Sequence, residues 1–153
     1  MKKVLLILAC GIATQLSYAQ ATPKWADKAK KAVFSIVTYD KDNKIKNTGN
    51  GFYINENGTA LSDYTLFEGA ERAVIINADS KELPVLRILG ANSMYDIVKF
   101  NTEADKKTIA LKSASQPASV GETVYLLPYS TQKAATCQTG TVTKVDTIGD
   151  KAY

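Results

Sequence analysis

The sequence predicts an all-β fold, either a sandwich or a barrel, with one short helix at its N-terminal end. Runs of strand length that are rich in β-branched and aromatic residues recur at spacings of about 8 to 12 residues, as in small antiparallel folds. Polar turn residues separate the runs, and no long helical pattern interrupts them. The expected strands cover residues 33–39, 51–54, 59–62, 72–77, 83–89, 95–101, 123–127 and 139–145. With 153 residues, 45% of them hydrophobic, the chain can bury the core of one domain, or of one domain and a fragment.

Residues 1–19 are predicted to be a secretory signal peptide. Two lysines precede an apolar run over residues 4–13, and Ser17-Tyr18-Ala19 supplies the small residues of a cleavage site after Ala19. The apolar run is shorter than the roughly 18 residues that a membrane-spanning helix needs. An alternative interpretation takes Cys10 as the lipidated residue of a lipoprotein. We expect an exported protein, periplasmic or extracellular, with no membrane attachment once the signal is cleaved.

Charge and composition exclude several classes of function. Cleavage after Ala19 removes two of the 19 basic residues and none of the 15 acidic ones, which leaves a net charge of +2 and no basic patch for nucleic acid. The chain has no histidine, and Cys137 is the single cysteine of the expected mature chain. The usual zinc site and Cys-His catalysis are therefore excluded, and we expect no metal and no cofactor. Cys137 is either a free thiol or half of a disulfide with a partner elsewhere.

The segment over residues 23–33 has helical spacing. Trp25, Ala26, Ala29 and Val33 would share one face, with a proline at the start of the segment. We therefore expect a short amphipathic helix that docks on the strands through this face and turns its lysines to solvent.

Residues 49–70 predict a hairpin followed by a helical turn. Asn57-Gly58 lies between two apolar runs and favours a type I′ turn, because both residue types tolerate positive φ. The helical turn opens at Asp63 or Tyr64, and Asp63 stands where an N-cap belongs. Residues 57–59 also match a glycosylation sequon, but the hairpin already accounts for them.

The C-terminal part of the chain is less regular. Residues 113–119 have the small, polar, Pro-containing composition of a linker, and Gly149-Asp150 is a second hairpin signal. The chain ends at Tyr153, where the return strand would begin. Because a strand without a partner exposes an edge, we expect the sequence to be truncated there.

Four short segments form an ordered set. They read GNGFYINENGTALSDYTLFEGA at residues 49–70, YDIVKF at 95–100, VGETVY at 120–125 and TGTV at 139–142. In this order they resemble the trypsin-like serine proteases of the HtrA type. That family reads Gly-Ser-Gly-Phe-Ile-Ile and Gly-Tyr-Val-Leu-Thr-Asn-Tyr-His-Val, then Tyr-Asp-Leu-Ala-Leu-Leu, then Val-Gly-Asp-x-Val and Gly-x-Val. The resemblance spans roughly residues 32–145.

This resemblance implies two six-stranded antiparallel β-barrels with a Ser-His-Asp triad between them. The chain would hold the first barrel over residues 20–115 and the start of the second over residues 116–153. The family's histidine falls on Thr65, its aspartate falls on Asp96, and its serine, in a Gly-x-Ser-Gly turn, would lie beyond Tyr153. A threonine hydroxyl cannot accept the serine proton near neutral pH. The resemblance therefore implies a pseudoprotease, with Thr65 not competent as a base and Asp96 as a vestigial triad residue.

Several of these residues also have structural interpretations. Asp96 is expected mainly to accept hydrogen bonds from the Thr65 hydroxyl or from nearby N–H groups. Asp63 and Glu68 could form a carboxylate pair for acid-base chemistry, but capping and solvation account for them better. Aromatic residues that could line a peptide groove, but that more often pack in the core, are Tyr64, Phe67 and Tyr95.

Two functional classes follow from the sequence. The first is an exported, non-catalytic module of the trypsin-like fold that binds or scaffolds a protein or peptide. The second is a serine endopeptidase whose nucleophile and substitute base, such as a lysine, lie beyond Tyr153.

Overall fold

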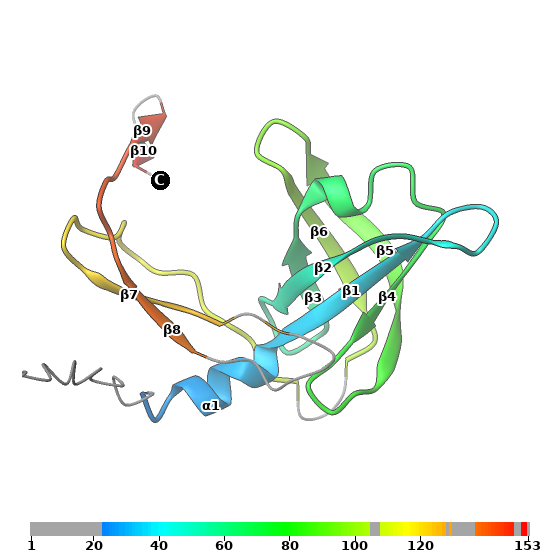
Figure 1. Cartoon of the computed structure of the whole chain (residues 1–153), viewed down its shortest axis with the longest axis horizontal. Coiled ribbons are helices and arrows are strands. Elements are labelled where there is room, and N and C mark those ends of the chain that lie inside the picture. The colour runs from blue at the N-terminus through cyan, green and yellow to red at the C-terminus, as the bar shows by residue number, and fades with distance from the viewer. Residues whose placement is uncertain (1–22, 105–107, 128, 130–136, 149–150, 153) are drawn as a thin grey trace, which may run out of the picture.

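The computed structural model describes residues 23–104, 108–127, 129, 137–148 and 151–152. Residues 1–19 and Cys10 lie outside these ranges, so the signal peptide and the alternative of a lipidated Cys10 stay predictions. Figure 1 shows a barrel on one side of the molecule and a separate two-stranded sheet on the other. None of the helices in the described ranges is long and apolar enough to cross a membrane.

The elements have the following bounds. The helical ones are α1 (Ala26–Ala29) and two 3₁₀ turns, η1 (Lys30–Ala32) and η2 (Tyr64–Leu66). The strands are β1 (Val33–Tyr39), β2 (Ile45–Tyr53), β3 (Thr59–Ser62), β4 (Arg72–Ile76), β5 (Glu82–Asn92), β6 (Ile97–Thr102), β7 (Thr123–Leu126), β8 (Gln138–Thr141), β9 (Thr147–Ile148) and β10 (Lys151–Ala152).

Six strands close an antiparallel barrel in the order β1-β2-β3-β6-β5-β4. β1 pairs with β2 on one side and with β4 on the other, and β3 pairs with β6. The all-β prediction is confirmed, and the architecture is a barrel. The β3–β6 ladder brings Ser62 opposite Val98, so the residues that follow β3 lie beside those that precede β6.

The barrel core is built from inward-facing aromatic and aliphatic side chains. Phe34, at 0% exposed, makes edge contacts with the rings of Tyr53 and Phe100 at centroid distances of 4.8 and 6.3 Å. Full burial of such a side chain contributes about 1.5–3 kcal/mol. Gly51 leaves room for this cluster, because a Cβ there would lie 2.5 Å from Cε2 of Phe34. The remaining buried members of the cluster are Ile36, Ala60, Ile75, Leu83 and Val98.

Strand β2 is longer than its predicted span of residues 51–54. It begins at Ile45, and none of its first six residues is buried, yet this stretch pairs with β1 through the backbone. The preceding turn is held by the Asp40 carboxylate, whose Oδ1 accepts hydrogen bonds from the backbone N–H of Asp42 (2.8 Å) and Lys44 (2.9 Å). Cross-strand hydrogen bonding extends β2 where no hydrophobic alternation marks a strand.

The prediction of a type I′ turn at Asn57-Gly58 is wrong. Gly58 has φ of +80°, but Asn57 is not among the residues with positive φ. Instead the side chain of Asn55 organises the loop, since its Oδ1 accepts from the N–H of Asn57 and of Thr59, both at 3.0 Å. Its Nδ2 also donates to Oγ1 of Thr59 at 2.9 Å. An Asx-type turn therefore replaces the two-residue hairpin.

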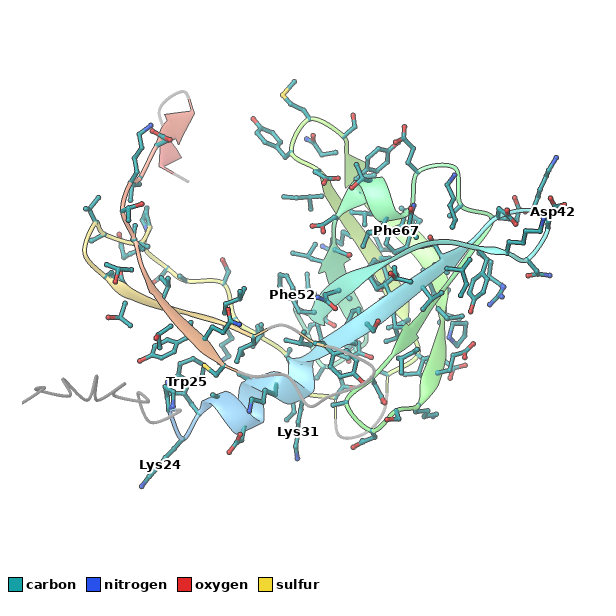
Figure 2. The ribbon with its side chains drawn as sticks, viewed as in Figure 1. Lys24, Trp25, Lys31, Asp42, Phe52 and Phe67 are labelled. Carbon is teal, nitrogen blue, oxygen red and sulfur yellow. The ribbon has the colours of Figure 1, made fainter. Side chains whose placement is uncertain are left out.

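The N-terminal helix is shorter than the sequence suggests. Regular α-helix covers four residues before a 3₁₀ turn, and Val33 already belongs to β1. Ala26 and Ala32 are buried, whereas Trp25 is 50% exposed. The Trp25 ring instead makes a perpendicular contact with the ring of Tyr125 of β7, at a centroid distance of 5.0 Å, on the side of α1 nearest the β7–β8 sheet (Figure 2). The four predicted residues thus do not form one docking face.

Two small sheets follow the barrel. β7 pairs with β8, and β9 pairs with β10. The predicted strand over residues 139–145 is observed only as Gln138–Thr141. Gly149-Asp150 lies outside the described residues, although the strands on either side of it pair as a hairpin would require. The proposed division at residues 115 and 116 stays a prediction.

Candidate functional site

Thr65 and Asp96 lie together at one end of the barrel. Thr65 belongs to η2, which follows β3, and Asp96 immediately precedes β6. The Thr65 backbone N–H donates to Oδ1 of Asp96 at 2.7 Å, and the Thr65 hydroxyl donates to Oδ2 at 3.1 Å. The Tyr64 N–H donates to the Asp96 carbonyl oxygen at 3.1 Å. The hydrogen bond expected between the Thr65 hydroxyl and the Asp96 carboxylate is therefore present, while their descent from a triad stays a prediction.

Asp96 performs the capping role that the sequence predicts for Asp63. Asp63 is the N-cap residue of η2 by position, but its side chain makes no capping hydrogen bond. The orphan N–H groups at the start of η2 are met instead by the carboxylate and the carbonyl of Asp96. The prediction of a capping side chain at Asp63 is therefore wrong, because Asp96, which lies 31 positions after Thr65, supplies the cap.

The backbone of Asp96 is held in a conformation that non-glycine residues rarely adopt. Its φ is +52°, in the left-handed region that aspartate tolerates better than most residues. Asn92 stabilises the same loop, since its Oδ1 accepts from the Tyr95 N–H at 3.1 Å. The loop thus directs the Asp96 carboxylate toward η2.

η2 is held in place by the barrel core and by a side chain of β2. The ring of Phe67 packs on Phe100 of the core at 5.2 Å, and Tyr64 also contacts the core. From β2, Nδ2 of Asn47 donates to the carbonyl oxygens of Leu66 (3.2 Å) and Thr65 (3.4 Å). Sequence reasoning missed Asn47, because its stretch of β2 has no hydrophobic alternation.

The aromatic residues proposed for a groove separate into two groups. Tyr64 and Phe67 pack against the core, as the structural interpretation expects. Tyr95 is 45% exposed, and its neighbours Met94 and Ile97 are 84% and 47% exposed. Exposed apolar side chains therefore precede and follow Asp96, in the loop between β5 and β6 and at the start of β6.

Thr65 and Asp96 engage each other through hydrogen bonds at this end of the barrel. Asp63 and Glu68 are both exposed. No cluster of three or more His, Cys, Asp or Glu side chains that could hold a metal ion occurs in the described part of the chain. Cys137 is a free thiol among the described cysteines.

Two cavities lie elsewhere on the molecule. One of about 420 Å³ is bordered by Lys31, Tyr53, Asn77 and Leu83, among others. The other, of about 270 Å³, lies between the segment after η2 and strand β5. Neither lining includes Thr65 or Asp96.

Comparison with known proteins supports the fold. No protein-family model and no curated protein matches the sequence. A crystal structure of the serine endoprotease from Yersinia pestis superimposes with a TM-score of 0.66 at 16% sequence identity, over 80% of this chain and 46% of that one. This chain thus spans about half the length of that protease. Together with the closed six-stranded barrel, the likeness shows that the chain has a trypsin-like fold.

Proposed function

We propose that this protein is an exported, catalytically inactive member of the trypsin-like fold that binds or scaffolds a protein or peptide. The observation that carries the proposal is the pairing of Thr65 with Asp96. Both carboxylate oxygens of Asp96 accept hydrogen bonds from Thr65, one from the backbone and one from the hydroxyl.

The absence of a general base at Thr65 supports the proposed lack of protease activity. In a Ser-His-Asp triad the imidazole takes the serine proton and returns it to the leaving amine, which requires a base that titrates near neutral pH. The Thr65 hydroxyl instead donates to the carboxylate that would orient that base. The sequence has no histidine that could replace it.

Exposed apolar side chains support a binding role. Met94, Tyr95 and Ile97 flank Asp96 and are each between 45% and 84% exposed. Contiguous apolar surface on a soluble protein commonly marks an interaction site. The barrel would then present this surface while the Thr65–Asp96 pair keeps η2 and the β5–β6 loop in place.

One probe tests both parts of the proposal. β-Casein is unfolded and readily cleaved by trypsin, so we expect the purified full-length protein, with any residues that follow Tyr153, to bind immobilised β-casein and to leave it intact, as judged by mass spectrometry. We also expect no labelling by a fluorophosphonate, with trypsin as the positive control. Cleavage or labelling would instead support the serine endopeptidase with a substitute base, and absence of binding would exclude the scaffold role.

A matched pair of variants locates the binding surface. Ile97→Asp places a charge in the surface beside Asp96, whereas Ile45→Asp changes an equally apolar side chain, 64% exposed, at the start of β2. We expect the first variant to weaken casein binding and the second to leave it unchanged. Equal effects would show that the surface beside Asp96 is not the binding site.

Export has its own test. N-terminal sequencing of the protein recovered outside the cytoplasm should begin at Gln20, as cleavage after Ala19 requires. A mature chain that begins with an acylated Cys10 would instead establish the lipoprotein alternative. Retention of residues 1–19 in the cytoplasm would overturn export.

A further inference from the structure

Strands β4 and β5 pair over only part of their length. Their ladder joins Val74–Ile76 to Glu82–Pro84, and Arg72 and Ala73 of β4 have no partner on β5 in that ladder. Beyond Pro84, β5 follows β6 instead, through bulges around Leu86 and Leu89. The barrel is therefore splayed between the start of β4 and the middle of β5, and the cavity of about 270 Å³ lies there.

Part of the lining of this β4–β5 groove is apolar. Phe67 and Val85, which border the groove, pack against the buried core. Leu86 and Ile88 also border it and are 59% and 46% exposed. The groove therefore offers an apolar slot that is open to solvent.

Arginines give the groove a net positive lining. Its ionisable residues are Arg72, Arg87 and Glu71. The Arg72 guanidinium is stacked over the ring of Tyr39 at 3.8 Å and donates to Oδ1 of Asn43 at 3.4 Å. Arg87 makes no ion pair or hydrogen bond through its side chain within the described residues. Arg87 belongs to the same lining as Leu86 and Ile88, and its charge has no partner within the described residues, so it is suited to a carboxylate on an otherwise aliphatic ligand.

We propose that the β4–β5 groove binds an extended peptide segment of a partner protein, with an aliphatic side chain in the slot and a neighbouring carboxylate on Arg87. The inference rests on the proposed function as a binding module, and it names a site distinct from the surface beside Asp96. The volume argues for one or two peptide side chains, because pockets for larger small molecules span about 300–1,000 Å³. Arg72 and Ala73 of β4 pair with β1 but have no partner on β5, so this edge of β4 offers an extended segment a strand to lie along.

The test uses fluorescein-labelled hexapeptides and fluorescence anisotropy. One peptide alternates valine and glutamate, and its control alternates valine and glutamine. We expect the glutamate peptide to bind at least about tenfold more tightly, because a charge-assisted hydrogen bond is worth about one to two powers of ten in affinity. Arg87→Gln should abolish that difference.

A variant of equal charge controls for general attraction. Lys28→Gln removes one positive charge from the exposed surface of α1, so both variants have the same net charge. We expect Lys28→Gln to bind the glutamate peptide as the wild type does. Leu86→Ser provides a second variant that removes part of the slot and keeps Arg87. Circular dichroism and the urea midpoint would establish that each variant is folded.

Each outcome decides the inference. Equal affinity of Arg87→Gln and Lys28→Gln for the glutamate peptide, or no binding of that peptide at millimolar concentration, would overturn it. If the protein nevertheless bound β-casein, the proposed function would stand and only the groove as its site would be overturned. Cleavage of a bound peptide, detected by mass spectrometry, would overturn the proposed function. If the affinity for the peptide still depended on Arg87, the assignment of the groove as the binding site would stand. Dimerisation lost in Arg87→Gln without peptide binding would show the occupant to be a second copy, against the proposal.

Discussion

At the scale of single residues, Asp96 combines several structural roles at the candidate site. Its carboxylate accepts two hydrogen bonds from Thr65, its carbonyl accepts one from Tyr64, and its φ is +52°. These roles are separable by substitution, because asparagine keeps an acceptor and tolerates positive φ, whereas alanine does neither well.

We therefore expect Asp96→Ala to lower the free energy of unfolding by about 1–3 kcal/mol, from lost hydrogen bonds and a strained backbone. Asp96→Asn should cost less than half as much. Urea denaturation of both variants measures the difference, with Asp63→Ala as a control that we expect to be nearly neutral, because its side chain caps nothing. Equal losses for Asp96→Asn and Asp96→Ala would contradict the assigned role.

Gly51 tests how tightly the barrel core is packed. A Cβ at this position would lie 2.5 Å from Phe34 and 2.9 Å from the carbonyl oxygen of Leu61. The backbone cannot yield as a side chain can, so Gly51→Ala should destabilise the protein by about 1–3 kcal/mol. Gly90→Ala is the matched control, since a Cβ there has open space around it. Equal reductions of the melting temperature in the two variants, measured by thermal unfolding, would show that packing at Gly51 is not the cause.

At the scale of elements, the loop between β2 and β3 depends on one side chain. Asn55 accepts two backbone hydrogen bonds and donates one to Thr59. Asn55→Ala should destabilise the protein by about 1–3 kcal/mol, because the N–H groups of Asn57 and Thr59 lose their acceptor. Asn55→Asp keeps the acceptor and should cost less. Guanidinium unfolding of the two variants measures this order, and a smaller loss for the alanine variant would contradict it.

The sequence predicted those elements whose local pattern agrees with their environment. β1 and β3 were predicted with their observed bounds, because both are rich in β-branched or apolar residues and largely buried. The first part of β2 was missed because it is polar and is held by pairing with β1. The helix was predicted too long because tertiary context draws Val33 into a strand. Local patterns cannot report such non-local pairing.

The candidate site shows the same division. The resemblance to HtrA-type proteases singled out Thr65 and Asp96, and the structure places them in contact. The capping role of Asp96 and the anchoring role of Asn47 were not predicted, since they join residues 31 and 18 or 19 positions apart. The β4–β5 groove was also missed, because it arises where two strands exchange partners.

At the scale of the whole molecule, the barrel and the β7–β8 sheet differ in how they are held. The barrel is closed and surrounds a cluster of fully buried side chains. All residues of β7 and β8 are exposed, and Figure 1 shows their sheet standing apart from the barrel. A two-stranded sheet without a buried face is marginally stable by itself. Local opening should therefore occur there long before the barrel unfolds.

Native-state hydrogen exchange measures this difference directly. We expect the amides of β1, β3 and β6 to exchange only through global unfolding, with protection that corresponds to about 5–15 kcal/mol. The amides of β7 and β8 should exchange several powers of ten faster. Tyr125→Ala removes the edge contact with Trp25, so it should lower protection in β7 and β8 further and leave the barrel amides unchanged. Uniform protection across both parts would contradict this division, because it would mean that the β7–β8 sheet folds and unfolds with the barrel as one cooperative unit.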